Sequence, residues 1–141
     1  MLEKIITGGQ TGADQAALDA AIKLGIPHGG WVPRGRLTED CPLPDKYDLT
    51  EMPGDSYAER TKKNIRESDG TLILSDGTLS GGSEYTQKMA LRYTRPLLHI
   101  DFHRMVPFDA AVVINNWMVD HDIKTLNVAG PRASSDPKIY R

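Results

Sequence analysis

Short continuous apolar runs alternate along the chain with longer stretches in which apolar residues recur at helical spacing. The runs lie at residues 4–7, 71–74, 96–100 and 125–128, with a shorter one at 30–32, and they are typical of buried parallel strands. Between them the spacing predicts helices that start after Thr11, at Ser56, after Gly82 and at Pro107. The chain therefore repeats strand and helix almost from end to end.

Residues with known helix-end preferences support these boundaries. Thr11, with Asp14 three residues later, forms a capping-box pattern, and Ser56 with Glu59 repeats it. Gly25 is typical of a helix end. The side chains expected to face inward are Ala58, Thr61 and Ile65 in the second helix, Thr86, Met89, Ala90 and Tyr93 in the third, and Ala110, Ala111, Ile114, Trp117 and Met118 in the last.

This order of elements predicts an α/β fold of Rossmann-like type. We expect a three-layer, doubly wound, mostly parallel sheet with helices on both faces. The 141 residues suit one domain, because ordinary domains have ~100 to 200 residues, so residues 1–141 should form a single Rossmann-like ligand-binding domain. Residues 33–53, rich in turn formers, are interpreted as an excursion from the sheet. Ser135 and Pro137 carry the start signals of one more helix.

Composition and charge exclude several classes of protein. The single cysteine, Cys41, allows neither an internal disulfide nor a zinc finger, and a net charge of -2 provides no basic field for nucleic acid. The longest apolar stretch, 110–119, is shorter than the ~18 residues of a membrane span. The first residues lack the basic start and apolar core of a signal peptide. We therefore expect a cytoplasmic protein with no membrane segment, no nucleic-acid partner and no structural metal.

Three glycine-rich turns, at 8–12, 76–83 and 130–135, each follow a predicted strand. Parallel strands end at one edge of a sheet, where helix N-termini attract anions, so the turns should lie together there. Glycine lets the backbone approach a phosphate closely, although tight strand-to-helix turns need glycine in any case. The three together favour a phosphate or oxyanion site whose candidate residues are Gly8, Gly9, Gln10, Thr11, Gly12, Asp14, Gly81, Gly82, Ser83, Gly130 and Arg132.

Arginines outside the turns are further candidates for binding an anion. Arg34 and Arg36 follow the shorter strand, and Arg60 shares a helix face with Asn64 four residues later. The alternative is that the helix carrying Arg60 is simply a solvated charged helix. Asp14 has a similar alternative, since a carboxylate in the first turn of a helix is stabilising without any ligand.

The common nucleotide fingerprints are absent. None of the glycine turns is followed by Lys-Ser or Lys-Thr, which excludes a Walker A loop. The first turn lacks the G-x-G-x-x-G spacing, and the second strand ends in Val32-Pro33-Arg34 where a dinucleotide fold has an acidic residue. An ordinary NTPase or NAD dehydrogenase is therefore not expected.

The segment 7–20, Thr-Gly-Gly-Gln-Thr-Gly-Ala-Asp-Gln-Ala-Ala-Leu-Asp-Ala, closely resembles the start of the molybdenum carrier family, the circularly permuted YpsA-like branch of the SLOG superfamily. The resemblance continues through residues 29–36, 60–64, 68–73 and 128–132. It implies a Rossmann-like fold and a site for a nucleotide-like or phosphorylated pterin ligand, the molybdenum cofactor among them.

A more distant resemblance is to the LONELY GUY phosphoribohydrolases, which cleave the bond between a base and ribose 5′-monophosphate. Residues 59–62, before the strand at 71–74, and residues 81–86, after it, follow the order of that family's motifs. The resemblance implies Arg60 and Glu84 as catalytic residues. No Gly-Thr pair follows Gly81-Gly82, however, and Glu84 falls earlier than the family's acidic residue. Glu84 is equally explained as a surface carboxylate near a helix N-terminus.

The alternation of His99, Asp101 and His103 places three polar side chains on one face of a strand that continues that far. A metal site is one interpretation, and a polar strand end is the other. The sequence thus predicts a binding or carrier protein for a small phosphorylated molecule, with a phosphoribohydrolase or a nucleotide-sensing module as alternatives. A homodimer or higher homo-oligomer is a further expectation.

Overall fold

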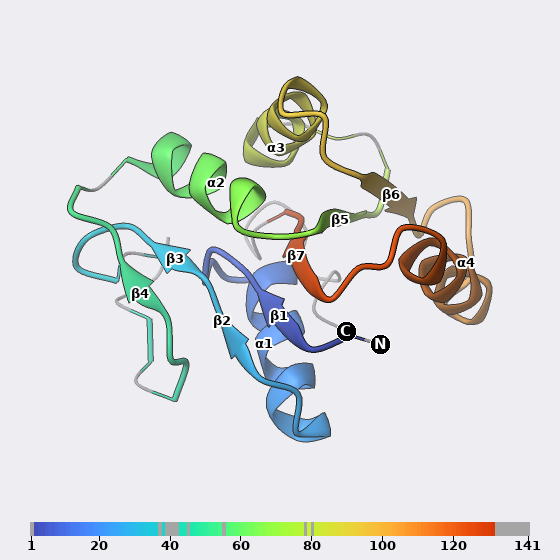
Figure 1. Ribbon diagram of the computed structural model, residues 1–141, viewed down its shortest axis with the longest axis horizontal. Coiled ribbons are helices and arrows are strands. Elements are labelled where there is room, and N and C mark those ends of the chain that lie inside the picture. Colours follow the sequence, from blue (N-terminus) through green and yellow to red (C-terminus); the bar gives the residue numbers. More distant parts are fainter. Residues whose placement is uncertain are drawn as a thin grey trace.

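The central element is a parallel sheet of five strands. In the computed structural model, which describes residues 2–36, 38, 43–44, 46–54, 56–77, 79 and 81–131, the strand order is β2-β1-β7-β5-β6 (Figure 1). The strands are β1 (Lys4–Ile6), β2 (His28–Gly29), β5 (Gly70–Ser75), β6 (Leu97–Asp101) and β7 (Thr125–Ala129). The predicted runs at 4–7, 71–74, 96–100 and 125–128 form β1, β5, β6 and β7, and all four neighbouring pairs are parallel. No predicted run corresponds to β2, and the shorter run predicted at 30–32 lies outside this sheet.

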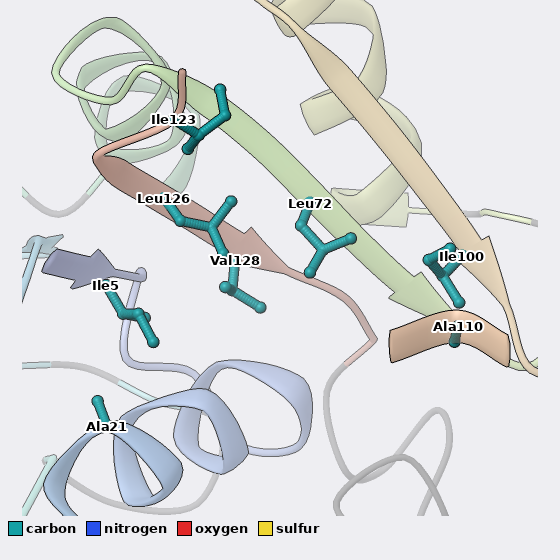
Figure 2. Packing of buried hydrophobic residues seen from close by; sticks show 8 residues of the cluster. All are labelled: Ile5, Ala21, Leu72, Ile100, Ala110, Ile123, Leu126 and Val128. Carbon is teal, nitrogen blue, oxygen red and sulfur yellow. The ribbon is translucent and has the colours of Figure 1, made fainter. Parts of the chain in front are cut away.

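Among the described residues, four helices cover the sheet on both faces. They are α1 (Ala13–Leu24), α2 (Tyr57–Arg66), α3 (Gly81–Arg92) and α4 (Pro107–Asp120). Residues of α1 and α4 pack against one face, where Ala21 and Ala110 join side chains of β1, β5, β6 and β7 in the main core (Figure 2). On the other face α2 packs against α3 and shares a core with it, built on Ile65, Met89 and Ala90. The predicted three-layer, Rossmann-like α/β architecture is confirmed.

The start of α1 differs from the prediction. Gly12, not Thr11, is the N-cap residue, with φ 79° and no side-chain cap, and the helix begins at Ala13. The Asp14 carboxylate instead accepts from the backbone N–H of Gln10 at 3.2 Å, on the turn that precedes the helix. The capping box is therefore wrong here, because the positive φ of Gly12 moves the helix start one residue along.

The other helix ends agree better with the sequence. The Ser56 hydroxyl accepts from the Glu59 N–H at 3.2 Å at the start of α2, and Gly25 ends α1 in the left-handed conformation. Two side chains expected to face inward are exposed, Ala58 and Ala111. Each lies at the border of the buried stripe of its helix, where an alanine does not predict whether the position is buried or exposed.

A second, two-stranded parallel sheet pairs β3 (Trp31–Val32) with β4 (Thr50–Glu51) beside the main one. Residues 33–53 thus leave the main sheet as expected but contain a strand that the sequence did not predict. The start signals at Ser135 and Pro137 lie outside the described residues. In the described part of the chain, no helix is long and apolar enough to cross a membrane.

Candidate functional site

A cleft of ≈ 580 Å³ opens at the carboxyl edge of the sheet. It lies where the first and third glycine turns and the start of α3 meet the helix α2. The turns that follow parallel strands, and the helix N-termini after them, lie at this edge, where open parallel sheets bind their ligands. The cleft is lined by Gln10, Asp14, Tyr57, Ala58, Arg60, Thr61, Gly81, Gly82, Ser83, Tyr85, Thr86, Ala129, Gly130 and Pro131.

Arg60 reaches from α2 across the first glycine turn. A side chain at Gly8 would overlap the Arg60 guanidinium, so the turn can accept Arg60 only because residue 8 is glycine. The guanidinium Nη1 lies 4.0 Å from the Asp14 carboxylate, and both side chains are largely buried, 15% and 6% exposed. A cation is thereby fixed on the floor of the cleft, with an acidic partner on α1.

The first turn is held together by its own polar groups. The Thr7 hydroxyl accepts from the Gly9 N–H at 3.0 Å, and the Gln10 side-chain oxygen accepts from the Thr11 N–H at 3.1 Å. Gly9 has φ 73° and packs against the β3 side of the molecule, where a Cβ would lie 2.9 Å from Val32. Of the predicted residues in this turn, Gln10 lines the cleft, and Gly8, Gly9, Thr11 and Gly12 do not.

The third turn is joined directly to the start of α1. The Ala13 N–H donates to the Pro131 carbonyl at 3.3 Å, and a Cβ at Gly130 would lie 2.5 Å from that of Ala13. From the other side, Gly81, Gly82 and Ser83 bring the first turn of α3 to the cleft. The opening N–H groups of a helix have no intrahelical acceptor, so this turn presents donors suited to an anion.

Three predicted binding residues lie away from the cleft in other contacts. Arg36 donates to the carbonyls of Leu43 at 3.2 Å and Tyr47 at 2.7 Å, as well as to those of Pro44 and Leu49, and so holds the loop that precedes β4. Arg34 is exposed, and its backbone N–H donates to the Gly54 carbonyl at 2.7 Å. Asn64 is 2% exposed and does not line the cleft.

Asn64 binds the backbone of β3 with both ends of its side chain. Its oxygen accepts from the Trp31 N–H at 2.8 Å, and its amide donates to the Trp31 carbonyl at 3.1 Å. The helix face that Arg60 and Asn64 share therefore faces the sheets at both positions. Arg60 meets the main sheet at the cleft, and Asn64 meets the small sheet.

Glu84 lies in a different cleft from Arg60. It lines a second hollow of ≈ 530 Å³ at the ends of β5 and β6, together with Gln87, His99, Asp101 and Arg104. Its carboxylate is half exposed and lies 3.5 Å from the Lys88 amino group. The structure therefore does not bring together the two residues that the phosphoribohydrolase resemblance implied as catalytic.

The polar residues of β6 also form local contacts. His99 is 2.7 Å from the Ser75 hydroxyl, and Asp101 accepts from the backbone N–H groups of Gly77 at 2.7 Å and His103 at 2.9 Å. These bonds, first that from Gly77, lower the pKa of Asp101. Within the described residues, no group of three or more His, Cys, Asp or Glu side chains is arranged to hold a metal.

Tyr57 and Tyr85 line the cleft from α2 and α3 but are not among the residues predicted from the sequence. No motif marks them, because their position depends on how the two helices pack across the sheet. Arg132, expected beside Gly130, lies outside the described residues.

Comparisons with known proteins agree with the fold. The circularly permutated YpsA SLOG family matches residues 5–141. A crystal structure from Syntrophus aciditrophicus SB, named "Putative molybdenum carrier protein", is 57% identical in sequence, with a TM-score of 0.97 over 99% of this chain and 88% of that one. No curated protein matches the chain.

Proposed function

Because the chain belongs to the circularly permutated YpsA SLOG family, we propose that it is a binding or carrier protein for a small phosphorylated molecule of nucleotide-like or pterin type. The ligand binds in the cleft at the carboxyl edge of the sheet. Its phosphate faces the glycine turns, and the remainder extends between α2 and α3.

The observation that carries this proposal is the position of Arg60. The guanidinium lies against Gly8 on the floor of a cleft lined by two further glycine segments, Gly81–Gly82 and Gly130. Phosphate recognition uses this combination of arginine and backbone N–H donors. Asp14, whose carboxylate lies 4.0 Å from Nη1, offsets part of the charge of Arg60 when the cleft holds no anion.

A carrier role is favoured over hydrolysis. Glu84, the carboxylate that the hydrolase would need, lines the other cleft and pairs with Lys88. The name of the structure from Syntrophus aciditrophicus supports a molybdenum-containing cargo, which we propose to be the molybdenum cofactor. A pterin phosphate and a nucleoside monophosphate share the anionic end that the cleft is built to accept.

Thermal unfolding with a panel of ligands tests the proposal. We expect AMP, ADP-ribose or a molybdopterin source to raise the unfolding temperature, since a ligand at ~100 times its Kd stabilises by about 2.7 kcal/mol. Arg60→Ala should weaken binding of the active ligand about 10- to 100-fold, because hydrogen bonds to charged groups contribute ~1.5–3 kcal/mol.

Arg66→Ala is the matched control, since Arg66 is an exposed arginine in the last turn of the same helix, outside the cleft. It should bind as the wild type does. Equal affinity in the wild type and Arg60→Ala would contradict the site, and no stabilisation by any phosphorylated compound would contradict the function. Stabilisation by molybdate alone would indicate an oxyanion carrier instead.

A further inference from the structure

The cleft is much larger than a phosphate needs. Its ≈ 580 Å³ lies within the ~300–1,000 Å³ of sites that enclose a whole small molecule. The charged and amide side chains of the cleft are Gln10, Asp14 and Arg60, and α2 and α3 form its sides, with the hydroxyls of Thr61, Ser83 and Thr86. A ligand anchored by its phosphate therefore has its other end between the two helices.

Each of these walls contributes one tyrosine to the cleft, Tyr57 from α2 and Tyr85 from α3. The two helices pack against each other, so the rings stand on neighbouring elements that the fold fixes in place. Tyr85 is half buried and packs on the core of Ile65, Met89 and Ala90. Tyr57 is 37% exposed, as expected of a residue at the edge of a cleft.

A cation lies over the Tyr57 ring. The guanidinium carbon of Arg60 lies 5.8 Å from the centre of the Tyr57 ring, within cation–π range. Arg60 thus lies against Gly8 of the first glycine turn and over the ring of Tyr57 on α2. One side chain therefore contacts both the proposed phosphate site and one of the two tyrosines.

We infer that Tyr57 and Tyr85 bind the ring of the ligand, so that the cleft selects phosphates carrying a planar heteroaromatic ring over ring-free phosphates and molybdate. This inference rests on the proposed function and specifies the end of the ligand that the glycine turns do not contact. Aromatic side chains stack on any nucleobase or pterin face, and two of them on adjacent walls favour a flat ligand.

The experiment measures, by calorimetry, the Kd of AMP and of ribose 5-phosphate, which share a phosphate and a sugar and differ by the ring. We expect the wild type to bind AMP at least ~10-fold more tightly. Tyr57→Leu and Tyr85→Leu should each weaken AMP binding ~10-fold, in line with loss of one stacking partner, and leave ribose 5-phosphate within ~2-fold. The Tyr→Phe variants keep the ring and should stay within ~3-fold for both ligands.

Tyr93→Leu is the matched control, because Tyr93 packs on the same core as Tyr85 but does not line the cleft. It should bind both ligands as the wild type does. Equal affinity of the wild type for AMP and ribose 5-phosphate, or an equal loss of both in the leucine variants, overturns the inference while the proposed function stands. Failure of both compounds, of a pterin phosphate and of inorganic phosphate to bind overturns the proposed function and the inference with it.

Discussion

The missing side chain of Gly8 determines where the Arg60 guanidinium can lie. Residue 8 does not have a positive φ, so alanine fits its backbone, and the Cβ would overlap only the flexible end of Arg60. We expect Gly8→Ala to cost about 1 kcal/mol of unfolding free energy, as many substitutions do. Because Arg60 must move, the same variant should weaken ligand binding ~10-fold or more. Urea unfolding and calorimetry together measure the two effects.

An alanine at Gly30 should be much more destabilising than one at Gly8. The φ of Gly30 is 123°, and a Cβ there would overlap the backbone oxygen of Thr7, which cannot move aside. Gly30→Ala should therefore cost ~3 kcal/mol or more. If Gly8→Ala were as destabilising as Gly30→Ala, or bound ligand like the wild type, Arg60 would not depend on Gly8 as described.

At the scale of elements, one side chain joins α2 to the small sheet. Asn64 makes two hydrogen bonds to the backbone of Trp31 at the start of β3. Asn64→Ala leaves a donor and an acceptor without partners and should cost ~2 kcal/mol or more. Asn116→Ala, on the exposed side of α4, should stay within ~0.5 kcal/mol. Chemical denaturation of both variants compares them, and equal losses would show that the two bonds contribute nothing net.

The elements also show what could be predicted from the sequence. Four strands of the main sheet, β1, β5, β6 and β7, could be predicted because buried parallel strands are continuous apolar runs. The meeting of the glycine turns could also be predicted, because parallel strands end at one edge. The edge strand β2 could not, because His28 and Gly29 form no apolar run. The strand β4 could not be predicted, because Thr50 and Glu51 are exposed and their partners, Trp31 and Val32, are distant in sequence. Tyr57 and Tyr85 could not be assigned to the cleft either, because only the packing of α2 on α3 puts them there.

At the scale of the whole molecule, Asp101 links folding stability to pH. Hydrogen bonds from Gly77 and His103 hold its pKa below the ordinary value of 3.8 in the folded state. The carboxylate therefore contributes stability that is present above pH 3.8 and is lost as the pH falls through the lower, folded pKa. Asp101→Asn removes this titration, so its unfolding free energy should fall less steeply than that of the wild type below about pH 4. If the unfolding free energies of the two proteins fell equally steeply with pH below about pH 4, Asp101 would not have this role.

The place of β7 in the sheet has a consequence for how the chain folds. β7 is the last strand in sequence yet lies in the middle, where Lys4 of β1 pairs with Thr125 and Gly70 of β5 pairs with Leu126. Until β7 arrives, β1–β2 and β5–β6 are separate pairs with no strand between them. Contacts between residues so distant in sequence are slow to form. During synthesis on the ribosome, the inner edges of β1 and β5 therefore stay uncovered until nearly the whole described chain has emerged, and the cleft at their carboxyl ends is completed last.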